Sequence, residues 1–259
     1  MCFSVPHSLG TPTWVCLRKS LVRRVSIWSF LTSFAPEPGC IDTHTVDVLD
    51  HDEVVRLYGP WKVRTPRDAA TFLGGYSGRW WIAGGWAIDA FTGTARAHGD
   101  LDIGIPRAEA EGFIEFAGAA LDVWAATGSL TPLPRHGASV PDDCGNLWLR
   151  ASGADPWEYD VLLDDVREHT WVYKRSSHIT RPLSHCVWSR DGIPYLRPEI
   201  QLLLKAKHAR PKDALDLERC LPNLDGDSRT WLTQSLRQEN PQHPWIGRLT
   251  DTSGPLSRS

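Results

Sequence analysis

Two aspartates, two positions apart, are the residues of this chain best suited to chemistry. Asp100 and Asp102 lie in a stretch where apolar residues alternate with polar or small ones, which predicts a strand over residues 101–105. Side chains at positions i and i+2 of a strand point the same way, so both carboxylates would share one sheet face, roughly 7 Å apart along the strand. Two carboxylates so close repel each other when ionised, and a hard divalent cation removes that conflict. We therefore expect Asp100 and Asp102 to hold Mg²⁺.

A pair of glycines precedes these aspartates. Gly84 and Gly85 lie between a predicted buried strand, residues 79–83, and a short predicted helix, residues 86–91. A Gly-Gly turn lets the backbone approach a ligand closely, and the N-terminus of the following helix favours phosphate. Two metal ions between the carboxylates and such phosphates would clamp the attacking and leaving oxygens of a phosphoryl displacement.

A third carboxylate is expected on a neighbouring strand. Asp160 interrupts an otherwise apolar predicted strand over residues 157–163. We expect it to act as general base toward an acceptor hydroxyl or as a ligand of the catalytic metal. Glu158 lies on the same predicted face and is the alternative, with Asp164 and Asp165 next in order.

The joined pattern is more specific than any of its parts. Residues 81–89 read Trp-Ile-Ala-Gly-Gly-Trp-Ala-Ile-Asp, and residues 96–103 read Arg-Ala-His-Gly-Asp-Leu-Asp-Ile. Together they resemble the signature of polymerase β-type nucleotidyltransferases, specifically the aminoglycoside 2''-adenylyltransferase-like group with its lincosamide nucleotidyltransferase relatives. The resemblance extends more loosely through residues 198–207 to Pro211-Lys212-Asp213 and Asp216, and so covers about residues 52–225.

The resemblance implies a fold, a donor and further site residues. The fold would be α/β (α+β), a mixed sheet flanked by helices with a small C-terminal helical region. The donor would be ATP or another NTP, and the cofactor Mg²⁺, held by Asp100, Asp102 and Asp160. Lys205 would contact the triphosphate, or else lie on a solvated helix face, while Arg96 and His98 would touch phosphate or fix the loop. Many relatives have Gly-Ser where this chain has Gly84-Gly85, so only backbone is offered there.

The expected activity is transfer of a nucleoside monophosphate, AMP in the simplest case, to a hydroxyl of a small molecule. An aminoglycoside or lincosamide antibiotic would make the chain an antibiotic-resistance enzyme. An acidic cleft would suit a polycationic aminoglycoside. Candidates for its lining are Asp142, Asp143, Asp155, Glu158, Asp164 and Asp165. The alternatives are a toxin-like nucleotidyltransferase acting on tRNA or protein, and a non-catalytic nucleotide-binding module of the same fold.

The composition of the chain limits the kinds of partner that it is expected to bind. The 259 residues carry a formal net charge of −3, which argues against nucleic-acid binding by bulk charge. No apolar run approaches the roughly 20 residues of a membrane-spanning helix. The six cysteines form no Cys-x-x-Cys pair and are expected to be reduced thiols of a cytoplasmic protein. Thirteen tryptophans predict aromatic core packing. The sequence gives no indication of the oligomeric state.

Four segments are expected along the chain. The first 36 residues contain no acidic residue and combine a basic stretch with a short apolar one broken by serine and threonine. They read as a weak export or transit signal, or as sequence outside the natural protein, and we expect residues 1–45 to be disordered or spurious. Residues 46–197 would form the nucleotidyltransferase domain and residues 198–240 a helical region, with its last helix over residues 231–237. Residues 241–259, polar and proline-rich, would be a flexible tail.

Overall fold

The computed structural model describes residues 51–251, so the expectation for residues 1–45 lies outside the described part of the chain. The described helices are α1 (His51–Tyr58), α2 (Pro66–Phe72), α3 (Gly84–Thr92), α4 (Ala110–Ala117), α5 (Pro198–Ala206), α6 (Pro211–Cys220), α7 (Gly226–Glu239) and α8 (Trp245–Thr250). Three short 3-10 turns accompany them, at Leu73–Gly75, Arg107–Glu109 and Leu183–His185. None of the helices in residues 51–251 has the length and apolar content needed to span a lipid bilayer.

The strands form one mixed sheet with a short side branch. They are β1 (Trp81–Ile82), β2 (Asp102–Pro106), β3 (Asp122–Ala126), β4 (Leu130–Leu133), β5 (Asn146–Arg150), β6 (Trp157–Arg167), β7 (Thr170–Val172), β8 (Thr180–Pro182), β9 (Val187–Arg190) and β10 (Ile193–Leu196). The order across the sheet is β4-β3-β5-β6-β2-β1-β10-β9, and β7 and β8 extend from β6. The pairs β2/β6 and β1/β10 are parallel and the other pairs antiparallel. The expected fold class, a mixed sheet flanked by helices with helices at the C-terminal end, is confirmed.

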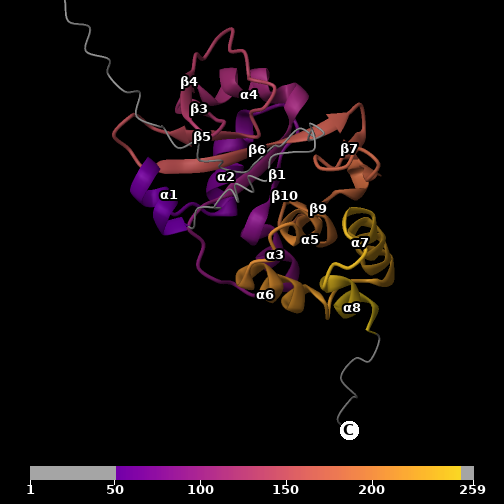
Figure 1. Ribbon diagram of the computed structural model, residues 1–259. Coiled ribbons are helices and arrows are strands. Elements are labelled where there is room, and N and C mark those ends of the chain that lie inside the picture. Colours follow the sequence, from indigo (N-terminus) through magenta and orange to yellow (C-terminus); the bar gives the residue numbers. More distant parts are fainter. Residues whose placement is uncertain (1–50, 252–259) are drawn as a thin grey trace, which may run out of the picture.

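Each face of the sheet is covered by helices with a distinct core. On one face, α2 and α4 bury Ala69 and Phe113 against Ile103 and Val161 of the central strands. The other core joins α3 and the C-terminal helices α5–α8, which Figure 1 shows gathered below the sheet in orange to yellow. A third cluster, rich in tryptophan, lies near α1. The carboxylates of interest lie on the central strands between these layers.

Local sequence explains where several helices begin. Thr65 caps α2, because its hydroxyl accepts from the backbone N–H of Asp68 while the Asp68 carboxylate accepts from the Thr65 backbone N–H. Proline occupies the first turn of α2, α5 and α6, where its missing N–H costs no hydrogen bond. Asp225 caps α7 by accepting from Ser228 N at 2.7 Å.

Four sequence expectations need correction. The Gly84-Gly85 pair is the first turn of α3 rather than a separate turn before it. The predicted helix over residues 231–237 is the longer α7, which begins five residues earlier because Asp225 caps it. The strand expected over residues 101–105 is β2, which begins at Asp102, so Asp100 lies just before it.

The fourth correction concerns the expected flexible tail at residues 241–259, of which residues 252–259 lie outside the described part of the chain. Residues 245–250 form α8, whose Trp245 and Leu249 are both 4% exposed within the core that α5 and α7 share. His243 Nε2 lies 3.0 Å from the Ala206 carbonyl oxygen and ties the segment to the end of α5. This polar stretch is ordered because two apolar side chains at helical spacing bury against α7.

Candidate active site

Asp102 and Asp160 lie directly beside each other on adjacent strands. They are register partners in the parallel pair β2/β6, and Asp160 N donates to the carbonyl oxygen of Leu101 at 3.1 Å. Directly paired residues project from the same sheet face. The sheet therefore brings together the two carboxylates that the sequence analysis assigned to neighbouring strands. Asp100, exposed and just outside β2, completes the group.

Burial and mutual repulsion perturb both paired carboxylates. Desolvation, and then the negative charge of Asp100, raise the pKa of Asp102 to about 7, although Lys205, Lys212 and Arg210 pull it down. Desolvation and the charge of Asp102 raise the pKa of Asp160 well above its ordinary value. A buried carboxylate pair with this electrostatic conflict favours either a proton or a cation. Perturbed carboxylates of this kind concentrate at functional sites.

Asn146 on β5 holds the Asp160 carboxylate in place. Its Nδ2 donates to Asp160 Oδ1 at 2.8 Å and to Oδ2 at 3.1 Å, and both side chains are buried. This hydrogen bond lowers the pKa of Asp160 and partly offsets the effect of burial. The sequence analysis did not single out Asn146. The available signal was an amide directly before three apolar residues of a strand.

Glu158, the alternative third carboxylate, is engaged elsewhere. It forms an ion pair with Arg64, whose Nε donates to Glu158 Oε2 at 3.0 Å, and lies 3.5 Å from Lys62 Nζ. The pairing of β5 with β6 shifts register beside it, between Leu149 and Arg150. The geometry therefore favours Asp160 as the third carboxylate, since Asp160 faces Asp102 and Glu158 faces two cations.

Gly84 occupies a position that no other residue fits. A Cβ there would lie 1.7 Å from Asp102 Oδ2, and its φ of +63° is a conformation that side-chain-bearing residues rarely adopt. The Gly84 N–H donates to Gln201 Oε1 of α5 at 2.8 Å. The glycine pair thus brings the backbone of α3 against the Asp102 carboxylate, and Gln201, which the sequence analysis did not identify, anchors this contact.

The loop between α3 and β2 is held by ionic and aromatic contacts. A Cβ at Gly85 would lie 2.3 Å from Arg96 Nη2, and Arg96 also approaches Asp216 at 3.6 Å. His98 Nε2 lies 2.7 Å from Asp89 Oδ2, and its ring stacks on Trp86 with centroids 4.3 Å apart. Burial lowers the pKa of His98 despite the neighbouring carboxylate. Of the two roles left open for His98, these contacts fit the fixing of the loop.

Lys205 lies in a buried ion-pair network. Its Nζ is 2.9 Å from Asp216 Oδ2 and 3.3 Å from Asp213 Oδ1, with its side chain 7% exposed. The alternative of a solvated helix face is therefore wrong, and its ammonium is already paired with two carboxylates. Lys212, exposed at the start of α6, is a second cation near the site, since Asp100 stabilises its charged form. The sequence analysis quoted Lys212 within the resemblance but assigned it no role.

The carboxylates do not form a ready-made metal cage. Within residues 51–251, no group of three or more histidine, cysteine, aspartate or glutamate side chains is arranged to hold a metal ion. The role of Asp100, Asp102 and Asp160 as three metal ligands stays a prediction. Mg²⁺ commonly takes only one or two carboxylates from a protein and the rest of its oxygens from water and substrate phosphates. The donor set fits an ion that a nucleotide brings with it.

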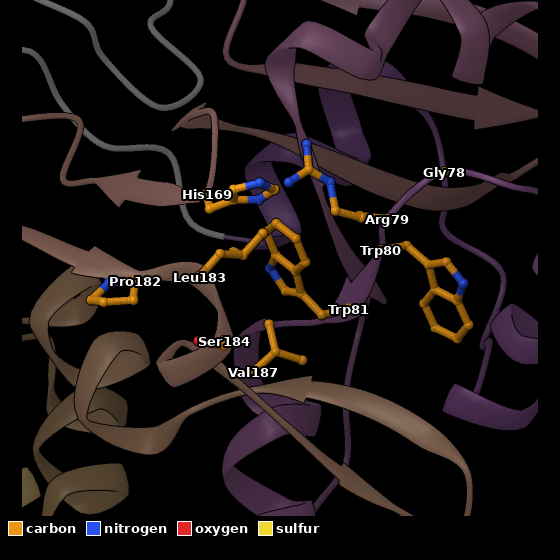
Figure 2. A pocket seen from close by; sticks show the side chains of 9 residues that line it. All are labelled: Gly78, Arg79, Trp80, Trp81, His169, Pro182, Leu183, Ser184 and Val187. Carbon is orange, nitrogen blue, oxygen red and sulfur yellow. The ribbon is translucent and has the colours of Figure 1, made fainter.

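Two pockets open elsewhere on the described surface, and neither is lined by a predicted site residue. One cavity of about 580 Å³ has Trp81, Leu183 and Val187 in its lining, and Figure 2 shows Arg79 and His169 on the same side of Trp81. The other, between α2 and the β9–β10 hairpin, has a volume of about 690 Å³. These cavities do not bear on the carboxylate site.

Comparison with known proteins confirms the resemblance over part of the chain. Residues 68–120 match the aminoglycoside-2''-adenylyltransferase family. This segment runs from α2 past the end of α4 and contains Gly84, Gly85, Asp100 and Asp102, whereas Asp160 and Lys205 lie outside it. No curated protein sequence matches the chain.

Three solved structures are similar to the chain. A lincosamide antibiotic adenylyltransferase with lincomycin bound is 15% identical, with 58% of this chain and 90% of that chain covered and a TM-score of 0.39. The antibiotic-resistance factor ANT(2'')-Ia, solved in solution, is 17% identical, with 65% and 87% covered and a TM-score of 0.42. The crystal structure of ANT(2'')-Ia in complex with adenylyl-2''-tobramycin is 15% identical, with 65% and 93% covered and a TM-score of 0.41.

Proposed function

We propose that this chain is a nucleotidyltransferase that moves a nucleoside monophosphate from an NTP, ATP in the first instance, to a hydroxyl of a small molecule. One observation carries the proposal. Asp102 and Asp160 are paired across β2 and β6, and Gly84 brings the start of α3 against Asp102. The match of residues 68–120 to an adenylyltransferase family supports the same reading.

The start of α3 and the nearby cations would receive the triphosphate. The first N–H groups of a helix have no intrahelical partner, and the helix dipole favours an anion there. Gly85 presents only backbone at this point, while Gly84 N is already bonded to Gln201. Lys212 and Arg210 lie close enough to lower the pKa of Asp102 and would add positive charge for the phosphates. In this arrangement Lys205 would not contact the triphosphate itself. It would hold Asp213 and Asp216 of α6 in place.

Asp100 and Asp102 would hold the divalent cation that accompanies the nucleotide. Such an ion, when bound, polarises a phosphoryl oxygen and neutralises the charge that develops in the displacement. Asp102 lies against Gly84, so its carboxylate is presented at the N-terminal end of α3. Asp100 is exposed and lies close enough to Asp102 to raise the pKa of that carboxyl. The pKa of Asp102 is raised because, without a bound cation, its carboxylate is buried close to the charge of Asp100.

Asp160 would accept the proton of the acceptor hydroxyl. In the proposed reaction its position beside Asp102 would bring it near the attacked phosphate, and Asn146 holds its carboxylate by two hydrogen bonds. A pKa raised by burial makes it a stronger base than an exposed aspartate. A positioned base of this kind contributes roughly two to four orders of magnitude in rate.

Antibiotics are the acceptors to test first. The structurally similar proteins include a lincosamide antibiotic adenylyltransferase with bound lincomycin and a complex with adenylyl-2''-tobramycin. The paired carboxylates weigh against a non-catalytic module. The net charge of −3 weighs against tRNA as the acceptor, since phosphate binding needs a concentrated basic surface.

Calorimetric titration of the protein with each NTP, in the presence and absence of Mg²⁺, tests the proposal. We expect binding of at least one NTP that strengthens with Mg²⁺ and is weakened in Asp102→Asn. Glu158→Gln is the control, because Glu158 is a buried carboxylate of the same strand as Asp160 that faces Arg64 and Lys62. Absence of any Mg²⁺-dependent NTP binding would favour a different function for the fold.

A further inference from the structure

The sheet fixes one of the two carboxylates proposed to hold the cation and leaves the other outside. Asp102 belongs to β2, whereas Asp100 lies in the loop between α3 and β2, where residues 94–101 form neither helix nor strand. Mg²⁺ demands near-ideal octahedral geometry, so a carboxylate that helps to hold it must itself be held in place. The contacts that fix Asp100 must therefore come from side chains around this loop.

Trp86, half-buried in the first turn of α3, contacts the loop at two points. Its indole Nε1 donates to the backbone carbonyl oxygen of Asp100 at 3.2 Å. Its ring stacks on the His98 ring, with the centroids 4.3 Å and the planes 27° apart. One side chain thus holds the backbone of Asp100 and the ring of the residue two positions before it.

Asp89 holds the same loop from the next turn of α3. Its Oδ2 accepts from the backbone N–H of Arg96 at 2.9 Å and lies 2.7 Å from His98 Nε2. Its Oδ1 lies 3.1 Å from Arg219 Nη2, which also donates to the Thr94 carbonyl oxygen at 2.8 Å. Aspartate is a poor helix former, and a buried charge is costly unless it is paired. The loop contacts explain why a 7% exposed aspartate occupies the interior of this helix.

Helix α3 contacts both of the proposed metal ligands. Trp86 and Asp89 are three positions apart and so lie on one side of the helix. Gly84, at its start, lies against the Asp102 carboxylate, and Trp86 bonds to the Asp100 backbone. The N-terminal N–H groups of the same helix are where the phosphates would bind. The spacing between the two carboxylates and the phosphates therefore depends on contacts made by this one helix.

We propose that Trp86 and Asp89 are positioning residues that hold Asp100 where it can share the nucleotide's Mg²⁺ with Asp102. This inference rests on the proposed function, since it concerns the cation of the same site. Neither side chain is a metal ligand in this arrangement, and both act through the loop that carries Asp100. Side chains that orient a metal ligand commonly contribute roughly ten- to hundredfold in metal affinity.

Calorimetric titration with α,β-methylene-ATP, once with Mg²⁺ and once with EDTA, tests the inference. Trp86→Phe removes the indole N–H and keeps a ring beside His98. We expect it to weaken nucleotide binding about tenfold in Mg²⁺ and to leave binding in EDTA unchanged. Asp89→Ala should show the same pattern. A side chain that served only to stabilise the fold would weaken binding under both conditions or under neither.

Combination with Asp100→Asn shows whether Trp86 acts through Asp100. In the Asp100→Asn background, Trp86→Phe should weaken binding in Mg²⁺ by less than about twofold, because residues that act through one another are not additive. Trp188→Phe is the matched control, because Trp188 is also a half-buried tryptophan but lies on β9 at the edge of the sheet. It should leave binding unchanged with Mg²⁺ and with EDTA.

The inference is overturned if Trp86→Phe binds the nucleotide in Mg²⁺ as wild type does, or if it weakens binding equally in EDTA. It is also overturned if Trp86→Phe weakens binding as much in the Asp100→Asn background as alone. Should Asp89→Ala fail to fold, the Trp86→Phe comparison decides by itself.

Asp100→Asn on its own separates this inference from the proposed function. If wild-type protein shows no Mg²⁺-dependent binding, or if Asp100→Asn retains all of it, the proposed role of Asp100 is wrong and the inference falls with it. If Asp100→Asn weakens Mg²⁺-dependent binding and Trp86→Phe does not, only the positioning role is overturned.

Discussion

Residue 84 lies where the backbone of α3 and the carboxylate of Asp102 come closest. Two effects require glycine there, namely the positive φ and the 1.7 Å approach that a Cβ would make to Asp102 Oδ2. Gly93, the C-cap of α3, separates these effects, because its φ is +70° and a Cβ there would meet nothing within 4 Å. Comparison of Gly84 with Gly93 therefore separates the need for a positive φ from the need for space beside Asp102.

We predict that Gly84→Ala abolishes transfer and Mg²⁺-dependent nucleotide binding, because Asp102 must move to admit the methyl group. Gly93→Ala should lower the free energy of unfolding by about 1 kcal/mol and leave transfer intact. Urea denaturation and turnover measured on both variants check this. Wild-type turnover in Gly84→Ala would mean that the contact between α3 and Asp102 has no part in the reaction.

Asp164 gives a pH dependence of stability that is separate from the proposed reaction. Burial raises its pKa from 3.8 to about 6, although Lys174 and the Trp171 indole partly offset this. Between those pH values the folded protein holds a proton that the unfolded chain has released. Stability attributable to Asp164 therefore falls as the pH rises from about 4 to about 6, by on the order of 3 kcal/mol in all. Asp102 and Asp160, with raised pKa values of their own, add slopes of the same sign.

Asp164→Asn should accordingly reduce the loss of unfolding free energy between pH 4 and 7 and keep the contact with Trp171. Asp165→Asn, at the neighbouring position that pairs with Arg167, should leave the slope unchanged. Urea titrations at a series of pH values measure both. Equal slopes in wild type and Asp164→Asn would show that this carboxyl is not perturbed.

For single residues of the site, the sequence allowed a prediction where the residues follow a local pattern. Alternation around Asp102 and the apolar run around Asp160 were enough to predict two carboxylates on adjacent strands. The contact of Asn146 with Asp160 could not be predicted, because the β5–β6 pairing brings together residues 14 positions apart in a register that a bulge shifts. The pairing of Glu158 with Arg64 likewise joins residues 94 positions apart.

Helices α5 and α6 meet through one buried cation. Lys205 projects from α5 between Asp213 and Asp216 of α6, and Arg210 and Arg219 contact the same two aspartates from the outside. Both carboxylates are almost fully buried. Removal of one member of a buried ion-pair network leaves uncompensated charge, which costs far more than loss of a surface pair.

Lys205→Met should therefore lower the free energy of unfolding by about 3–5 kcal/mol at neutral pH. Arg237→Met, which removes an exposed cation from α7, should change it by no more than about 0.5 kcal/mol. Chemical denaturation of the two variants gives the comparison. A stable Lys205→Met protein with impaired NTP binding would instead mean that Lys205 contacts the triphosphate directly.

Element boundaries were predictable where capping chemistry is local and not where packing decides. Pro66, Pro198 and Pro211 mark the starts of three helices in the sequence and in the structure. The N-cap residue of α8, Pro244, supplies no side-chain cap, so the spacing of Trp245 and Leu249 is the main local sign of a helix there. Residues 245–250 form one because Trp245 and Leu249 bury against the helices that precede them, a contact that no local pattern encodes.

On the scale of the whole molecule, the C-terminal helices and the sheet share one core. The cluster that contains Trp81 of β1 and Ile88 of α3 also contains Leu203 of α5 and Leu236 of α7. Polar contacts cross the same boundary, because Arg219 of α6 reaches Asp89 of α3 at 3.1 Å. Residues 198–240 therefore pack against residues 51–197 through both apolar and charged contacts.

We predict one cooperative thermal transition for the protein, with equal calorimetric and van't Hoff enthalpies, as expected of a single folding unit. Differential scanning calorimetry measures both enthalpies in one experiment. Two resolved transitions would mean that the two segments fold independently, as the sequence analysis divided them.

The central claim is that Asp102 and Asp160 together carry nucleotidyl transfer, and the most direct measurement is the amount of adduct that mass spectrometry finds on an acceptor after incubation with ATP and Mg²⁺. Wild-type protein and Glu158→Gln should form an adduct one AMP heavier than the acceptor. Asp102→Asn should form none, and Asp160→Asn should form it roughly two to four orders of magnitude more slowly with nucleotide binding retained. Wild-type rates of adduct formation in both aspartate variants would contradict the account.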